Sequence, residues 1–430
     1  MPRLVLKGAR HPGDIAIESP LVTAIGPSDP LPGDTTLDCD GCIVTAGLVN
    51  SHHHLYQWLT RGRAQSCNLF EWLSELYPVW ARLTPKDAAA AAARGIAELA
   101  LSGATTVFDH HYVVPKGDDS VFDVIAAAGR RIGVRLHVAR GSMDLGESKG
   151  GLPPDDVVEE TAAILDSTAE VSKRLHDGEM TNVVVAPCSP FSVTPELMRE
   201  SAALARRLGL RLHTHLAETL EEERDCLERF GRRPLEVVEE LGWLGPDVWF
   251  AHGIHLDDKE VSRLGEAGTG VAHCPSSNGR LGAGICPVRR LLDGGAPVGL
   301  GVDGPASNEG GTLFGEMRQA LLLARLRDRE PAALLPREAL ALATSGGAAC
   351  LGRPELGRVE IGAPADLAVW PAGDLADIED PLAALVLGPD RRVRHLVVAG
   401  ELVVEDGALL HADIEQLREQ AALAARRLWS

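Results

Sequence analysis

The chain has 430 residues, 45% of them hydrophobic and 24% charged, and its formal net charge is -19. This acidic balance excludes nucleic acid and anionic membranes as main partners and favours a small, uncharged or cationic substrate. No apolar run approaches the roughly 20 residues that a bilayer span requires, so we expect no membrane segment.

The first residues, MPRLVLKGARHPG, lack the apolar core of a secretory signal. The eight cysteines are scattered without the dense pattern of a disulfide scaffold. We therefore expect a cytoplasmic protein whose cysteines are free thiols. Cys39 and Cys42 form a Cys-x-x-Cys that no second pair follows at zinc-ribbon spacing, and we interpret it as part of a turn.

Residues 1–45 contain short β segments, LVLKGAR, DIAIESP and LVTAIG, separated by Pro and Gly turns. In residues 46–354, short β-branched runs alternate with helical stretches rich in Ala, Leu, Arg and Glu, which is typical of parallel α/β folds. Eight such alternations predict a TIM-like (β/α)8 barrel. The predicted strands are 42–52, 104–110, 134–140, 182–188, 210–216, 248–253, 270–274 and 297–303.

In residues 355–430, β character returns in RVEIGAPADLAVWP and VRHLVVAGELVVEDG, and a helix, DIEQLREQAALAARRL, follows. Neither β-rich end of the chain has enough strands to be stable alone. We therefore predict that residues 1–45 and 355–430 combine into a small β-sandwich-like domain beside the catalytic barrel.

Barrel enzymes carry their catalytic groups at the carboxyl ends of the strands. In this sequence those positions hold an unusual number of imidazoles and carboxylates. They are His52, His53, His54, Asp109, His110, His111, His213, His215, Glu218, His252, His273 and Asp303.

A metal site follows from the spacing of these residues. His52 and His54 share one face of an extended strand, and His53 faces the other side. A hydrolytic zinc site needs three or four N or O ligands and one position for water, and His215 and Asp303 on other strands complete the set. We expect one divalent metal ion per chain, Zn2+ with Fe2+ as the alternative. His213 lies two residues earlier in its strand, where we expect a packed, hydrogen-bonded core histidine.

The motifs GLVNSHHHL, HLAE, AHG, HCPSSN, LGVDGPASN and ATSGGAACLGR, with GAPADLAVW near the end, resemble the amidohydrolase superfamily in its mononuclear aminohydrolase branch. Within that branch the chain looks most like the 8-oxoguanine deaminase group. The segments LFEWLSELYPVWARLTP, APCSPFSVTPELMRESA and LHTHLAETLEEE carry this nearer similarity. Its neighbours are the guanine deaminases, the S-adenosylhomocysteine deaminases and the triazine hydrolases.

The resemblance implies metal ligands at His52, His54, His215 and Asp303. It implies a proton shuttle at Glu218, a catalytic His252 beside the substrate and the metal-bound water, and a second proton transfer through Asp303. The implied reaction is hydrolytic deamination of an amino-substituted N-heterocycle, 8-oxoguanine or a similar oxidised purine, by metal-bound hydroxide with release of ammonia. By composition alone, Glu218 would be interpreted as a surface glutamate of the next helix, and AHG alone is too short to identify His252 as catalytic. The places of the two residues in HLAE and AHG, in the order of the family's motifs, favour the catalytic roles.

The resemblance also indicates substrate-binding residues. Gln57 matches the position where purine deaminases of this branch hold the ring with an amide, and Cys188 matches a position that varies with the substrate. Trp72, His110 and His252 are assigned to the same pocket. The roles of His53, His110, His111 and His273 stay open, and a homo-oligomer is expected.

Several alternatives remain at this point. The loop 61–68 is shorter than in the 8-oxoguanine group, and residues 108–112 carry an aromatic side chain and an extra histidine, so a pterin, guanine or S-adenosylhomocysteine stays open as the substrate. A triazine hydrolase differs only in its pocket residues. A binuclear dihydropyrimidinase-like enzyme needs a lysine at the end of the fourth strand, which reads VVVAPCSP. A catalytically inactive scaffold protein would not need the full set of ligands.

Overall fold

The centre of the molecule is a barrel of eight parallel strands, seen in a computed structural model that describes residues 3–114 and 118–430. Neighbouring strands follow one another in chain order, from β6 to β13. Backbone hydrogen bonds from Ser51 N to Leu300 O (3.0 Å) and from Asp303 N to His52 O (3.0 Å) close the ring. The predicted TIM-like barrel is therefore confirmed. Its strands are β6 (Leu48–Asn50), β7 (Ala104–His111), β8 (Arg135–Ser142), β9 (Thr181–Pro187), β10 (Arg211–Leu216), β11 (Val248–His252), β12 (Gly270–His273) and β13 (Val298–Leu300).

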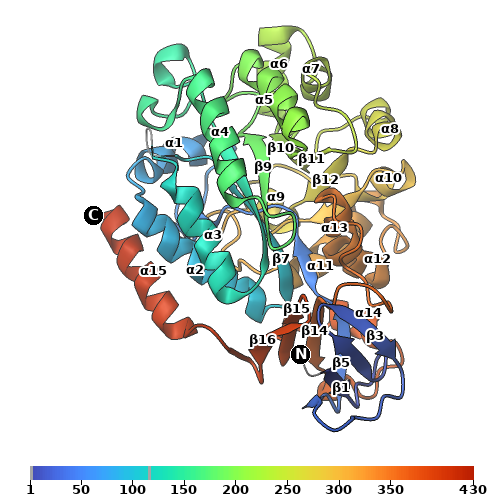
Figure 1. The fold of residues 1–430 in the computed structure, drawn as a ribbon. Coiled ribbons are helices and arrows are strands. Elements are labelled where there is room, and N and C mark those ends of the chain that lie inside the picture. The colour runs from blue at the N-terminus through green and yellow to red at the C-terminus, as the bar shows by residue number, and fades with distance from the viewer. Residues whose placement is uncertain (1–2, 115–117) are drawn as a thin grey trace.

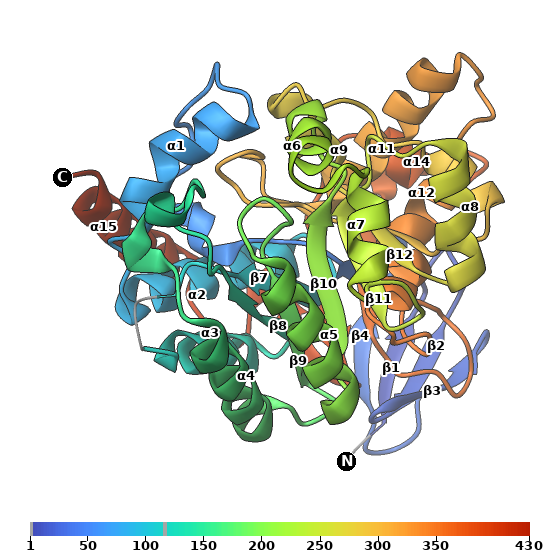
Figure 2. The same ribbon diagram turned by 90° about the horizontal axis from the view of Figure 1, so that it is seen from above.

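Helices surround the barrel (Figures 1 and 2), and local signals set their ends. Thr84 and Asp87 form a capping box at the start of α2, and Gly209 ends α5 in the left-handed conformation. The helices are α1 (Leu69–Trp80), α2 (Pro85–Leu101), α3 (Ser120–Ile132), α4 (Thr161–Leu175), α5 (Pro195–Leu208), α6 (Leu220–Phe230), α7 (Pro234–Glu240), α8 (Asp258–Ala267), α9 (Pro275–Arg280), α10 (Val288–Asp293), α11 (Leu313–Asp328), α12 (Pro336–Ala341) and α13 (Gly347–Cys350). Shorter turns are η1 (Leu55–Leu59), η2 (Glu147–Lys149), η3 (Asp155–Val157) and the π-helical η4 (Leu342–Gly346).

Both ends of the chain contribute to a smaller β unit, which lies at one end of the barrel in Figure 1. One sheet has the order β3-β2-β1-β4, and the other has the order β17-β16-β15-β14-β5. Side chains of both sheets, among them Leu6, Val44 and Leu367, form one apolar core. The predicted β-sandwich-like appendage is thus confirmed. Its strands are β1 (Leu4–Lys7), β2 (Ile15–Glu18), β3 (Leu21–Ile25), β4 (Thr35–Asp38), β5 (Cys42–Ala46), β14 (Leu367–Pro371), β15 (His395–Val398), β16 (Glu401–Glu405) and β17 (Ala408–Leu409).

The first predicted barrel strand, 42–52, is wrong as a single element. Residues 42–46 form β5, which pairs antiparallel with β14 of the small unit, and only β6 belongs to the barrel. The chain changes sheets at Gly47, where an added Cβ would lie 2.3 Å from the Thr105 hydroxyl oxygen. A continuous β-branched run does not reveal such a change of partner, because the residues in both sheets are equally buried.

The last helix, α15 (Ile414–Trp429), returns to the barrel and lies along α2 in Figure 1. It buries Leu417, Ala421 and Leu428, and Arg418 Nε donates to Glu98 Oε1 of α2 at 2.7 Å. The segment before it contains η5 (Gly373–Leu375) and α14 (Pro381–Leu387). Among the described residues, no helix is long and apolar enough to cross a bilayer, and all eight cysteines are free.

Candidate active site

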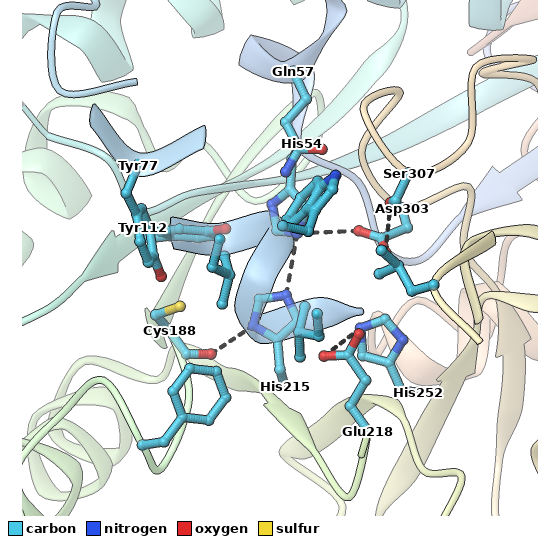
Figure 3. Close-up of a pocket in the computed structure, with 15 residues that line it drawn as sticks. His54, Gln57, Tyr77, Tyr112, Cys188, His215, Glu218, His252, Asp303 and Ser307 are labelled. Atoms are coloured by element: carbon cyan, nitrogen blue, oxygen red, sulfur yellow. Dashed lines mark hydrogen bonds and ion pairs between the residues drawn. The ribbon is translucent and has the colours of Figure 1, made fainter. Parts of the chain in front are cut away.

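Four side chains from three parts of the barrel rim converge on one point, and Figure 3 shows three of them, His54, His215 and Asp303. His52 and His54 follow β6, His215 lies near the end of β10, and Asp303 follows β13. The Nε2 atom of His54 lies 3.1 Å from Nε2 of His215 and 3.2 Å from Oδ1 of Asp303, which is 3.4 Å from Nε2 of His52. Ligands about 2.0–2.1 Å from a tetrahedral zinc ion are separated by about 3.3 Å, so these spacings fit one divalent ion.

The outer nitrogens of the three histidines make the hydrogen bonds that such a site requires. Nδ1 of His54 donates to the carbonyl oxygen of His110 (2.7 Å), and Nδ1 of His215 donates to that of Cys188 (2.6 Å). Because a carbonyl oxygen only accepts, the proton is on Nδ1 and the lone pair of Nε2 faces the centre. Burial lowers the pKa of His52 to about 3 and that of His215 well below its usual range, which keeps both rings neutral.

His52 is held differently, through His213. Nδ1 of His213 donates to the carbonyl oxygen of Trp249 (2.9 Å), so its Nε2 accepts from Nδ1 of His52 (2.9 Å). The Nε2 atom of His52 is buried and has no hydrogen-bond partner among the described residues, as expected of a ligand atom. His213 is therefore the buried, hydrogen-bonded histidine that its place in the strand predicted, and it orients a neighbouring ring.

Asp303 is fixed by three groups around it. Oδ2 accepts from the Ser277 hydroxyl (2.6 Å), and Oδ1 accepts from the Gly304 N–H (2.7 Å). The backbone carbonyl of Asp303 accepts from Nδ1 of His53, which gives the middle histidine of the triplet a positioning role. Burial raises the pKa of the Asp303 carboxyl, but the neighbouring His52 and His54 rings outweigh that effect and hold the pKa well below its usual range.

A second pair of titratable groups stands beside the four side chains. Oε2 of Glu218 lies 3.6 Å from Nε2 of His252 (Figure 3), and Nδ1 of His252 donates to Oδ1 of Asn278 at 2.9 Å. Both Glu218 and His252 are buried. Burial, and then the charge of Asp303, raise the pKa of Glu218 to about 8, so this carboxyl holds a proton at neutral pH.

A cavity opens next to these groups. Gln57 of η1, Trp72 of α1 and Cys188 beyond β9 line it, as do His54, His215, Glu218, His252 and Asp303. The structure thus brings the predicted pocket residues together with the four converging side chains, with one exception. His110 is fully buried outside this lining: its Nε2 donates to the Ala186 carbonyl oxygen (2.9 Å), and its ring stacks 4.9 Å from that of His215.

Sequence reasoning missed seven lining residues. Tyr112 directly follows β7, Phe191 follows β9, and Ser307 follows Asp303 by four residues, so their closeness to strand ends was a usable signal. Leu69, Leu73 and Tyr77 come from α1, and Leu281 follows α9. The resemblance placed Trp72 of α1 in the pocket. The apolar residues around it would equally suit a core helix, so their pattern does not show that Leu69, Leu73 and Tyr77 also line the cavity. His111 and His273 are buried outside the lining.

The fold and the site together define a class of protein: a (β/α)8 barrel with a buried cluster of histidines and one aspartate, which could hold a metal ion, at the carboxyl end of its strands. This chain belongs to the amidohydrolase family, whose model matches residues 43–403.

Three similar proteins place the chain within that family. An 8-oxoguanine deaminase from Pseudomonas aeruginosa is 49% identical over 403 residues, covering 92% of this chain and 90% of that protein. An isoxanthopterin deaminase from an unknown prokaryotic organism is 37% identical, covering 98% and 93%. The crystal structure of atrazine chlorohydrolase TrzN from Arthrobacter aurescens TC1, complexed with zinc, superposes with a TM-score of 0.93 at 32% identity, covering 98% of this chain and 100% of that chain.

Proposed function

We propose that this protein is a metal-dependent deaminase that hydrolyses an amino-substituted N-heterocycle and releases ammonia, with 8-oxoguanine or a similar oxidised purine as its substrate. The observation that carries this proposal is a buried acid, Glu218, beside a cluster of histidines and an aspartate and beside a cavity lined by an amide and a thiol. The 49% identity to an 8-oxoguanine deaminase supports the choice of ring.

His52, His54, His215 and Asp303 would hold one divalent ion, Zn2+ or Fe2+. Zinc is the first choice because the ligand spacings fit its tetrahedral geometry and because the related triazine hydrolase was crystallised with zinc. Such an ion lowers the pKa of a bound water to about 7 and so supplies the nucleophile at neutral pH.

Glu218 and His252 carry out proton transfer around the reacting carbon. Glu218 donates its proton to a ring nitrogen, which makes the ring more electrophilic, and then accepts a proton from the attacking water. His252 lies within 3.6 Å of Glu218 and is oriented by Asn278. From this position His252 can hydrogen-bond to the substrate and stabilise the tetrahedral adduct.

Asp303 provides the second proton transfer. Its carboxylate borders the cavity and stays ionised because His52 and His54 stabilise the negative charge. It can therefore accept a proton from the nucleophile and pass it to the amino group, which then leaves as ammonia.

The cavity walls determine which ring is accepted. Gln57 can both donate to and accept from a ring edge, and its Oε1 is buried with no partner among the described residues. Burial raises the pKa of Cys188 to about 12, so it presents a neutral S–H donor that suits a carbonyl oxygen such as the extra oxygen of an oxidised purine. Trp72 adds an aromatic wall. We propose substrate contacts for these three residues and for His252. The remaining proposed substrate residue, His110, would act through the stacked ring of His215.

The test is an ammonia-release screen of the metal-loaded protein over 8-oxoguanine, guanine, isoxanthopterin, S-adenosylhomocysteine and amino-triazines. We expect the highest kcat/KM for 8-oxoguanine. A clear preference for isoxanthopterin would favour the pterin alternative, which the 37% identity to an isoxanthopterin deaminase keeps in view. No ammonia from any of these compounds, with one equivalent of zinc bound, would overturn the proposal.

Replacing Glu218 with Gln removes the transferable proton but keeps the shape of the side chain. We expect Glu218→Gln to retain one metal ion per chain and to lose turnover by at least about a hundredfold, the scale of general acid and base catalysis. Glu228→Gln, an exposed substitution on α6, is the matched control and should leave kcat unchanged. Metal analysis and steady-state kinetics measure both effects, and near-normal activity of Glu218→Gln would contradict the shuttle role.

Three expectations from the sequence stay predictions: a cytoplasmic location, a homo-oligomer, and domain boundaries at residues 45/46 and 354/355. Gel filtration with light scattering tests the second of them.

A further inference from the structure

Glu222, a buried acid in the first turn of α6, is not used by the proposed chemistry. It is 1% exposed, whereas its neighbours Glu221 and Glu223 are partly exposed. Its two carboxylate oxygens each accept one backbone N–H: Oε1 from Ala217 at 3.0 Å and Oε2 from Glu218 at 2.8 Å. One buried carboxylate therefore fixes the backbone N–H groups of Glu218, the proposed proton shuttle, and of Ala217, the residue before it.

These contacts differ from ordinary helix capping. Thr219 is the N-cap of α6 and accepts from the Glu222 N–H at 3.2 Å. In a capping box, an acid at this position would reach back to the N–H of the N-cap residue itself. The Glu222 side chain instead reaches one and two residues further back, to Glu218 and Ala217. Its contacts therefore serve the segment between β10 and α6 rather than the end of the helix.

That segment has an unfavourable backbone conformation. Ala217 has φ +52°, in the left-handed region, which is unfavourable for a residue with a Cβ. The turn lets His215, on the extended strand, and Glu218, three residues later, both line the cavity. Without the left-handed residue, the alternation of the strand would continue and direct Glu218 elsewhere.

The same turn also contacts the segment that follows His252. The Ala217 carbonyl oxygen accepts from the N–H groups of Ile254 and His255, both at 2.9 Å, and the Leu216 carbonyl oxygen accepts from Gly253 N–H at 3.1 Å. A movement of Ala217 would therefore change the distance between Glu218 and His252.

We propose that Glu222 is a positioning residue for proton transfer: its carboxylate holds the left-handed turn at Ala217 and thereby aims Glu218 at the ring nitrogen of the substrate. This inference rests on the proposed function, because it assigns Glu222 a role through Glu218. It predicts a loss of kcat with little change in KM or metal content.

The experiment compares Glu222→Gln with the wild type, Glu218→Gln and the double variant. The amide that replaces the carboxylate has one acceptor oxygen and turns its NH2 group toward a backbone N–H. One of the two hydrogen bonds from Ala217 N–H and Glu218 N–H is therefore lost. We expect kcat to fall about tenfold or more in the wild-type background and not to fall further in the Glu218→Gln background, since both substitutions affect one step. A merely structural role would lower kcat by the same factor in both backgrounds, which would overturn the proposal.

A second readout does not depend on activity. In the zinc-loaded enzyme, amide hydrogen exchange of a peptide containing Ala217 and Glu218 should be faster in Glu222→Gln, and unchanged in the control Glu228→Gln. If Glu222→Gln folds poorly, Glu222→Asp keeps the charge but is one methylene too short to reach both N–H groups, and should show the same two effects. Unchanged exchange in Glu222→Gln would overturn the proposal that Glu222 holds the turn at Ala217. Faster exchange in a protein that releases no ammonia would instead overturn the proposed function, while the role of Glu222 in holding the turn at Ala217 would be supported.

Discussion

His52 shares its Nδ1 proton with the ring of another histidine, whereas His54 and His215 donate theirs to backbone carbonyls. Any residue supplies a backbone carbonyl oxygen, but the acceptor for His52 is the Nε2 atom of His213. This atom can accept because His213 donates from Nδ1 to the carbonyl oxygen of Trp249. Partners of this kind set the ring orientation and the basicity of a ligand. We therefore expect the metal affinity of the site to depend more on the side chain of His213 than on the side chains of His110 and Cys188, which supply only their backbone carbonyls to the histidines.

His213→Leu tests this dependence. Leucine has no acceptor, so Nδ1–H of His52 loses its partner in a buried place, and we expect metal affinity to fall about 10–100-fold. Competition with a chelator measures the affinity. His137→Leu is the matched control, since His137 is equally buried on β8 but outside the ligand cluster. Equal affinities of the two variants would contradict the role of His213.

Asp109 connects the site to the pH dependence of stability. Burial raises the pKa of this carboxyl to about 7, and Oδ1 accepts from the N–H of Leu55, the residue after His54. Since the folded pKa lies above the usual 3.8, the folded state binds more protons between these values, and stability falls as the pH rises from about 4 to 7. The difference between these two pKa values corresponds to a loss of about 4 kcal/mol in the free energy of unfolding over this pH range.

Asp109→Asn removes this titration and keeps an oxygen for Leu55 N–H. We expect the variant to be more stable than the wild type at pH 8, by up to about 4 kcal/mol, with the difference shrinking toward pH 4. Urea unfolding at pH 5 and pH 8 measures it. A difference that does not change with pH would show that Asp109 is ionised throughout this range.

At the scale of elements, the loop after β13 lies against η1, and glycine makes this approach possible. A Cβ added to Gly304 would lie 1.8 Å from Oε1 and 2.1 Å from Cδ of Gln57. The end of that side chain has no hydrogen-bond partner at Oε1 among the described residues, so it can move away. A methyl group here would therefore displace the proposed substrate-reading amide and leave the backbone of both elements where it is.

We expect Gly304→Ala to raise KM for the preferred heterocycle about tenfold, while metal content and Tm stay close to those of the wild type. A lost hydrogen bond to a ligand group is worth this order of magnitude. Gly310→Ala is the control in the same loop, because its added Cβ would meet the nearest atom, Asn308 Oδ1, at an ordinary 3.5 Å. If Gly304→Ala binds substrate as well as the control does, Gln57 does not read the ring.

At the scale of the whole molecule, a buried ion pair helps to join the barrel to the small β unit. Arg135 of β8 donates to both carboxylate oxygens of Asp366, which lies just before β14, from Nε at 2.7 Å and from Nη2 at 3.2 Å. Both side chains are buried, and the Ala399 N–H also donates to Asp366, at 2.7 Å. Removal of one partner would leave the other charge buried without compensation.

Asp366→Asn should therefore lower the free energy of unfolding by about 3 kcal/mol and lower Tm by a few degrees. Since the pair lies at the amino end of β8, opposite the catalytic rim, we expect unchanged kcat and KM at temperatures where the variant is folded. Differential scanning calorimetry and kinetics at about 25 °C measure the two effects. A loss of activity without a loss of stability would mean that the small unit communicates with the site.

Much of this organisation can be predicted from residue order. Period-2 spacing separates His52 and His54 from His53, and the alternation of short β-branched runs with Ala- and Leu-rich helices is local enough to reveal the barrel. The positions of His215 and Asp303 follow, because the carboxyl ends of parallel strands meet at one rim. Each of these properties depends on neighbours along the chain, and such neighbours are visible in the sequence.

The rest depends on contacts between distant segments, for which no local signal exists. Only the tertiary structure shows that the chain changes sheets at Gly47, that Leu69, Leu73 and Tyr77 of α1 join Trp72 in the cavity wall, and that His110 is packed behind His215. It also decides that Glu222, one of several acidic residues in LEEER, is the one that turns inward. The side chain of a glutamate is the same at the surface and in the core, and what distinguishes Glu222 is that the folded backbone brings a left-handed turn within its reach.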